Sequence, residues 1–151
     1  MYKLEIYVKI KLRFELNRLA LDIGKARIGI AISHSWLATN YQTLYAKTWT
    51  KDTKHIAEIV QKESIEEVIV GLPLNMDGTE SEMCQYAKKF CEMLKTKILA
   101  KIIFVDERLS SISAEEIMHN SNVKTKSKKG LIDQIAATVI LQSYLDNQKE
   151  I

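Results

Sequence analysis

The sequence predicts an α/β protein, a mixed five-stranded sheet with helices on both faces. Residues 18–33 pair two apolar strands around a glycine turn. The short apolar runs at 67–72 and 101–105 are typical of buried parallel strands, and helix-length segments separate them. The 151 residues suit one domain, and 46% hydrophobic with 27% charged residues is ordinary for a globular chain.

The first 17 residues form an extension before the predicted domain at 18–151. Residues 2–16 alternate strictly between apolar and mostly charged side chains, which is typical of an amphipathic strand. Three interpretations stay open: an extra edge strand, a strand that pairs two subunits, and a leader without fixed structure. The role of this extension is not assigned by the sequence.

The hairpin at 18–33 carries the first candidate site residue. Its first strand is apolar from Leu19 to Ile23 except for Asp22, and a buried, unpaired carboxylate costs on the order of several kcal/mol. Gly24 is expected to take a positive φ and open the turn. A carboxylate held beside a glycine turn is therefore either a ligand for a cation or a cap of the turn itself.

The middle of the chain alternates strands and helices. A third strand is expected within 38–47, and Asp52 is expected to cap a helix that runs to Glu63. The strand 67–72 ends at the single proline, Pro73, and residues 75–78 form a turn.

The second half follows the same logic. Thr79 and Glu82 have the spacing of a capping box and predict a helix to about residue 96. After the strand 101–105 come a short helix at 113–120, a basic loop at 122–129 and a last helix at 130–146. Cys84 and Cys91 lie two helical turns apart, too far for a disulfide, so both are expected to be reduced.

Acidic residues gather at the predicted ends of strands. Asp22 lies in the first strand, Asp106 and Glu107 follow the last strand, and Asp133 shares an apolar face of the last helix. If the first and last strands are adjacent and parallel, Asp22 and Glu107 meet at one sheet edge and the helix brings Asp133 to it. Converging carboxylates need a cation, and Mg²⁺ or Mn²⁺ suits such oxygen ligands. The alternative is capping and pairing with arginines.

Four sequence blocks carry a family resemblance, and they lie at 20–33, 70–79, 105–110 and 133–145. With them the chain resembles the YqgF-type, RuvX-like family of Holliday junction resolvases and pre-16S rRNA nucleases. The resemblance implies a ribonuclease H-like fold and a two-metal site of Mg²⁺ or Mn²⁺. The catalytic, metal-binding acids would be Asp22, Glu107 and Asp133; whether Asp106 also binds metal stays open. Ala26 replaces the first residue of the family's usual basic pair and leaves Arg27.

The function expected is that of a metal-dependent nuclease processing the 5′ end of the small-subunit ribosomal RNA precursor. Arg27 and Arg108 are candidates for binding substrate phosphates, or structural ion-pair partners. The basic loop adds the candidates Lys124, Lys126, Lys128 and Lys129. Alternatives are resolution of branched DNA and RNA binding in ribosome assembly without catalysis. A sugar-kinase or actin-like ATPase is disfavoured because it needs two lobes.

Net charge and hydrophobicity limit the partners and the cellular location that can be expected. The net charge of +3 permits a nucleic-acid partner, with structured RNA expected and branched DNA as the alternative. The chain has no apolar run of about 20 residues and no hydrophobic signal segment, so a cytoplasmic protein without a membrane partner is expected. A homodimer stays open.

Overall fold

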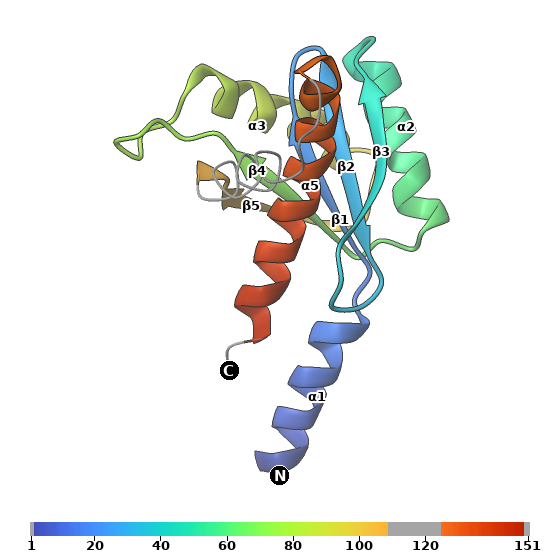
Figure 1. Ribbon diagram of the computed structural model, residues 1–151. Helices are drawn as coiled ribbons and strands as arrows, with labels where there is room; N and C mark the ends of the chain where they lie inside the picture. The colour runs from blue at the N-terminus through green and yellow to red at the C-terminus, as the bar shows by residue number, and fades with distance from the viewer. Residues whose placement is uncertain (1, 109–124, 150–151) are drawn as a thin grey trace.

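The sheet predicted from the sequence is present in the computed structural model (Figure 1). The structure describes residues 2–108 and 125–149, with backbone alone at 11–14, 125–134 and 149. The predicted helix at 113–120 lies outside the described residues. The strands are β1 (Arg18–Ile23), β2 (Arg27–Ser33), β3 (Thr39–Tyr45), β4 (Glu67–Leu72) and β5 (Lys101–Asp106). The helices are α1 (Tyr2–Glu15), α2 (Trp49–Lys62), α3 (Glu82–Lys95) and α5 (Thr125–Lys149).

The strand order is β3-β2-β1-β4-β5, which confirms a mixed sheet. The first three strands form an antiparallel meander, while β4 and β5 continue the sheet parallel to β1. Parallel neighbours need crossover connections, and α2 and α3 supply them. The helix α5 crosses the sheet in front of these strands in Figure 1, and the buried residues of α2 and α3 form a separate core with Leu19 and Leu21 of β1.

Each face of the sheet has its own core because side chains alternate along a strand. Leu19, Leu21 and Ile23 of β1 belong to the larger core under α2 and α3. Ala20 belongs to the core under α5, together with Ala137 and other small or branched residues. The alternation puts Asp22 on the same face as Ala20, which is the α5 side.

Three local predictions were wrong in detail. The side chain that caps α2 is Thr48, and the buried carboxylate of Asp52 instead accepts the backbone N–H of Lys47 at 3.0 Å. The cap of α3 is Ser81, which accepts the N–H of Cys84. Gly24 has no positive φ; a glycine fits there because a Cβ would stand 2.7 Å from the carbonyl oxygen of Arg27.

The N-terminal extension is the helix α1, so the strand expected from its alternation is wrong. This segment leads straight into β1, which is central, and the sheet edges are β3 and β5. A helix satisfies its backbone hydrogen bonds locally, and the segment is rich in Lys, Leu and Glu, which favour helix. Alternation with a period of two distributes apolar residues around a helix, which leaves Tyr2 77% and Leu4 66% exposed.

The last helix begins earlier than predicted. Because α5 starts at Thr125, the positions of Lys126, Lys128 and Lys129 are helical and the basic loop expected there is wrong. Lysine is a good helix former, and Gly130 is tolerated inside the helix at a cost of about 1 kcal/mol. Lys124 lies outside the described residues. Among the helices described, none has the length and hydrophobicity needed to cross a bilayer.

Candidate active site

Asp22 and Glu107 come together although their strands are not neighbours. The condition considered in the sequence analysis, that the first and last strands are adjacent, is not met, because β4 separates β1 from β5. Glu107 directly follows β5, and its backbone N–H donates to the Leu72 carbonyl at 3.2 Å. The Glu107 side chain nevertheless forms a hydrogen bond with Asp22. It must therefore reach across β4.

Gly71 of β4 is the residue that makes this reach possible. A Cβ built on Gly71 would lie 2.6 Å from Oε2 of Glu107 and 3.2 Å from its Cβ. The same atom would lie 2.7 Å from Cδ1 of Ile140 on α5. Glu107 therefore occupies the space over Gly71, between the sheet and α5. No side chain larger than hydrogen fits at position 71 without moving Glu107 or Ile140.

The two carboxyl groups are held in an environment that disfavours charge. The pKa of Glu107 is raised to about 8, first by burial and then by the charge and hydrogen bond of Asp22. A hydrogen bond between two carboxyl groups requires a proton on one of them. A divalent cation can replace that proton and neutralise both groups, and carboxylate oxygens are the ligands that Mg²⁺ and Mn²⁺ prefer. The pair therefore fits the predicted metal.

For the third predicted acid, Asp133, the structure describes the backbone alone. Asp133 belongs to α5, and helical periodicity sets its position one turn before Ala137, on the face that packs against the sheet. Its side chain is not among those described. Within the described side chains there is no group of three His, Cys, Asp or Glu residues suited to a metal ion, so the acidic trio stays a prediction.

Arg108 is engaged in structural contacts. Its Nε and Nη2 lie 2.9 and 2.7 Å from one carboxylate oxygen of Asp106, and its Nη1 donates to the carbonyls of Asn75 and Met76. The Arg108 hydrogen bonds lower the pKa of Asp106. The guanidinium thus joins the end of β5 to the turn at 75–78. The turn itself was predicted from the sequence, and its Gly78 has φ +86°. These contacts favour the structural alternative for Arg108, and a phosphate contact stays a prediction.

Arg27 lies at the same end of the sheet as Asp22. It opens β2, and the register pairs Asp22 with Gly29, two residues beyond it. The tight turn is closed by a 2.9 Å hydrogen bond from the Gly24 N–H to the Arg27 carbonyl. A contact between Arg27 and substrate stays a prediction. The same holds for Lys126, Lys128 and Lys129, whose side chains are not described.

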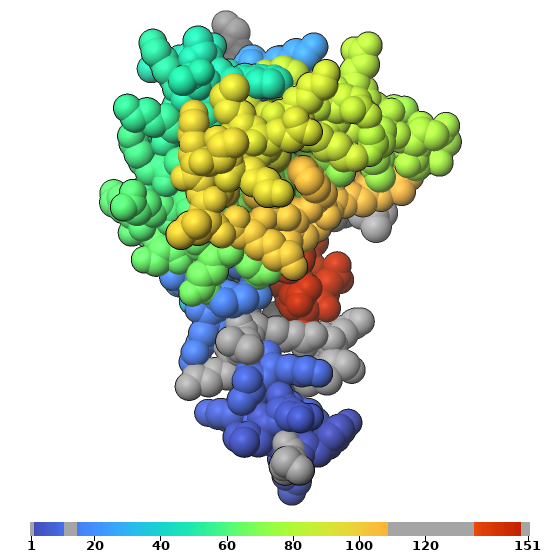
Figure 2. Space-filling view, turned by 180° about the vertical axis from the view of Figure 1, so that it is seen from behind, coloured from blue at the N-terminus to red at the C-terminus, as the bar shows by residue number. Residues whose placement is uncertain are grey.

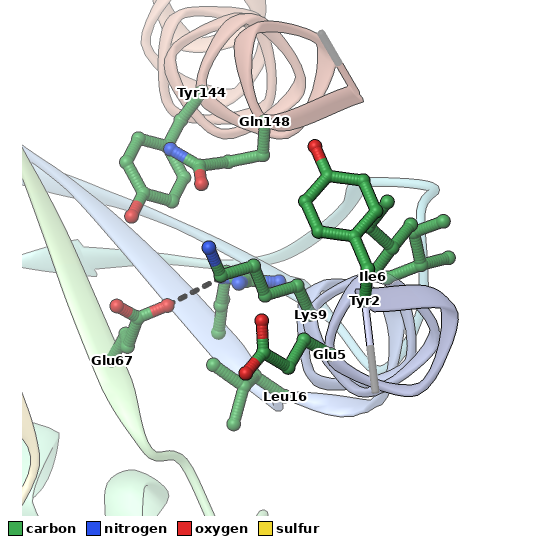
Figure 3. A pocket seen from close by; sticks show the side chains of 10 residues that line it. Tyr2, Glu5, Ile6, Lys9, Leu16, Glu67, Tyr144 and Gln148 are labelled. Atoms are coloured by element: carbon green, nitrogen blue, oxygen red, sulfur yellow. Dashed lines mark hydrogen bonds and ion pairs between the residues drawn. The ribbon is translucent and has the colours of Figure 1, made fainter. Parts of the chain in front are cut away.

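A separate pocket lies far from this site. It has a volume of about 420 Å³ between α1 and the C-terminal part of α5, where Tyr2, Lys9 and Tyr144 line it (Figure 3). Its floor includes the ion pair of the buried Arg18 with Glu67, with Nε and Oε1 2.7 Å apart. Arg18 opens β1 and Asp22 stands near its other end, so this pocket is no part of the acidic site.

Sequence reasoning missed two features, one in the acidic site and one outside it. The role of Gly71 was not recognised, although a glycine inside a run of branched residues signals a close approach. The second feature is an aromatic pocket around Trp49 and Tyr86, close to the hairpin turn. Its residues are distant in sequence, and no spacing rule links them.

Comparison with known sequences gives a consistent result. A family model described as RuvX, Holliday junction resolvase, matches residues 16–147. A relative from Caldanaerobacter subterraneus subsp. tengcongensis is 42% identical over 134 residues, covering 87% of this chain and 96% of that protein. Another, from Leifsonia xyli subsp. xyli, is 40% identical, covering 87% and 86%. Both carry the name "Putative pre-16S rRNA nuclease".

Solved structures confirm the ribonuclease H-like fold. The RuvC protein of T. thermophilus in complex with a Holliday junction substrate matches with a TM-score of 0.56 and 12% identity, over 87% of this chain and 96% of that chain. The fowlpox virus resolvase with Holliday junction DNA matches with a TM-score of 0.50 and 18% identity, over 87% and 98%. At these identities the likeness concerns the fold alone.

Proposed function

Because the chain belongs to the RuvX family of Holliday junction resolvases, we propose that Asp22, Glu107 and Asp133 form its catalytic, metal-binding centre. The family and its relatives identify the chain as a nuclease, a hydrolase of phosphodiester bonds. What we add is the assignment of the centre, of the metal and of the preferred substrate. The metal is Mg²⁺ or Mn²⁺, in a two-metal arrangement.

The observation that carries the proposal is the Asp22–Glu107 pair over Gly71. Two carboxyl groups share a hydrogen bond in a partly buried place, and Gly71 keeps that place open. A pair of this kind with only a structural role would be costly, because burial disfavours the charge of either carboxyl group and two ionised groups would repel each other. A bound cation would neutralise both carboxylates and so account for their placement side by side.

Each residue of the proposed centre has a distinct role. Asp22 is fixed by the rigid β1, and Glu107 by the Leu72 carbonyl and the Gly71 space. Asp133 would close the site from α5 as the third ligand. When bound, the metal ions activate water and stabilise the leaving oxygen of the phosphodiester. Arg27 is proposed to bind a phosphate beside the site.

We propose structured RNA as the substrate, and specifically the 5′ end of the small-subunit ribosomal RNA precursor. The support is the name shared by the two relatives reported above, which cover most of this chain. Branched DNA is the second candidate, since the matching family model is described as a Holliday junction resolvase.

The test compares both substrates under the same conditions. The full chain is incubated with Mn²⁺ or Mg²⁺ and either a labelled ribosomal RNA precursor or a labelled four-way DNA junction. Cleavage of the RNA at a defined 5′ position, lost in Asp22→Asn and in Asp133→Asn, supports the proposal. Cleavage of the junction alone would transfer it to branched DNA, and cleavage that survives both substitutions would refute the centre.

A further inference from the structure

A small aromatic and basic pocket lies on the other face of the sheet, near the hairpin turn. Its volume is about 370 Å³, within the range of roughly 300–1,000 Å³ that is usual for small-molecule sites. The lining comes from three segments: the turn, the start of α2 and the first turns of α3. The lining residues are Lys25, Trp49, Glu82, Gln85, Tyr86 and Lys89.

The aromatic wall is fixed by its own contacts. The Trp49 indole Nε1 donates to the Tyr86 hydroxyl at 3.0 Å, and the two rings meet at 78° with centroids 5.2 Å apart. The buried Phe90 supports Trp49 edge-on at 6.0 Å. Because both Trp49 and Tyr86 are partly exposed, the wall is held in place and still reachable from solvent.

Two cations stand at this wall. The Lys25 ammonium lies 5.9 Å from the centre of the Tyr86 ring, and Lys89 lines the same pocket from α3. Both lysines are exposed. An aromatic surface with lysines beside it is the combination that proteins use to hold a base and its phosphates in single-stranded nucleic acid.

The hairpin turn links the pocket to the acidic site. Lys25 follows Asp22 by three residues, and the Ala46 N–H donates to the Ala26 carbonyl at 2.9 Å, which ties the start of α2 to the hairpin turn. At the top of Figure 2 the blue turn, the teal start of α2 and the yellow-green α3 come together. Asp22 itself faces α5, so the turn separates the pocket from the acids.

We propose that this pocket, named here the Trp49 pocket, binds one unpaired nucleotide next to the cleavage position. The base lies on the aromatic wall of Trp49 and Tyr86, and Lys25 and Lys89 contact the adjoining phosphates. A strand that reaches both sites has to bend around the hairpin turn, which unstacked single strands do readily and duplexes resist. The inference rests on the proposed function and narrows its substrate to RNA with a single-stranded segment at the cut.

The binding test uses Trp49 as its own reporter. The chain has two tryptophans, so Trp36→Phe leaves Trp49 as the single fluorophore. A short oligouridylate is titrated into this full-length variant with a chelator present, so that cleavage plays no part. We expect saturable quenching of Trp49. In the same background, Lys25→Ala with Lys89→Ala is expected to weaken binding about tenfold or more.

The control matches the loss of charge. Lys62→Ala with Lys95→Ala removes two exposed lysines from the last turns of α2 and α3 and is expected to leave the titration unchanged. Thermal melts of both double variants check that they fold, and Gln85→Ala, at the exposed rim, gives an independent single change. Equal weakening by the two double variants, or no quenching in the parent, would overturn the inference.

A second readout separates this inference from the proposed function. The cleavage KM for an RNA with an unpaired segment should rise in Lys25→Ala with Lys89→Ala, while kcat changes little. If the parent cuts no substrate yet Trp49 is quenched and the lysine effect holds, the nuclease assignment fails and the pocket stands. If cleavage proceeds and these lysines affect neither quenching nor KM, the pocket assignment alone fails.

Discussion

The Asp22 and Glu107 side chains share a hydrogen bond across β4, over a residue that has no side chain. Their strands are separated, so the contact depends on Gly71 as much as on the acids. This arrangement concentrates negative charge where burial disfavours it. It makes predictions that distinguish a metal site from ordinary packing.

Asp22→Asn is expected to lower cleavage by at least about a hundredfold, the order lost when one preorganised electrostatic group is removed. The fold should be unchanged or more stable in a chelator, because asparagine keeps the shape, can still accept a hydrogen bond from Glu107 and removes a partly buried charge. Thermal melts without metal and cleavage of labelled RNA in Mn²⁺ measure both effects. Glu92→Gln, on the exposed side of α3, is the matched control and should change neither. A folded Asp22→Asn protein that cuts as fast as the parent would exclude Asp22 as a metal ligand.

Gly71→Ala tests the space under Glu107. The added methyl group would meet Glu107 Oε2 at 2.6 Å and Ile140 Cδ1 at 2.7 Å, so one of them must move. We expect a loss of stability of about 1–3 kcal/mol, as for other overpacked cores, together with loss of most cleavage. Denaturant unfolding and cleavage rates are the measurements. Ala87→Val overpacks the buried side of α3 and should cost stability while sparing activity per folded molecule. Full activity in Gly71→Ala would mean that the position of Glu107 is not critical.

The stability of the metal-free protein should fall as pH rises. The pKa of Glu107 is raised to about 8 in the folded state from an ordinary value of 4.5, so the folded state binds the proton more tightly than the unfolded chain does. The stabilisation from this group is complete below about pH 4.5 and is lost as pH rises through about 8. Melts in a chelator across this window should show the decline, and Glu107→Gln should flatten it. A decline of the same size in Glu107→Gln would assign the effect to other groups.

Removing residues 2–15 should leave a cooperatively folding protein. Most of the described side chains of α1 are exposed, and the family match begins at residue 16. The ion pair of Arg18 with Glu67 belongs to β1 and β4 and does not need the helix. A thermal melt followed by circular dichroism, with cleavage measured in parallel, checks this. Loss of the cooperative transition on truncation would show that α1 is part of the core.

Several elements could be predicted from the sequence because their signals are local. The hairpin at 18–33, the strand 67–72 and the turn at 75–78 depend on apolar runs and on glycine and proline. Cys84 and Cys91 are free and buried, as expected from their spacing in one helix. The positions of Asp22 and Glu107 at strand ends also followed from these boundaries.

Other features were decided by the tertiary structure. The alternating segment at 2–15 is a helix, which satisfies its backbone hydrogen bonds within the segment, and alternation alone carries no information about available strand partners. The approach of Asp22 to Glu107 depends on β4 lying between their strands with Gly71 at the crossing. The Trp49 pocket joins a turn and two helices that only the packing of α2 beside α3 brings together. Local patterns fix what each segment can become, whereas contacts between distant segments depend on strand order and side-chain volume, which no short window of sequence contains.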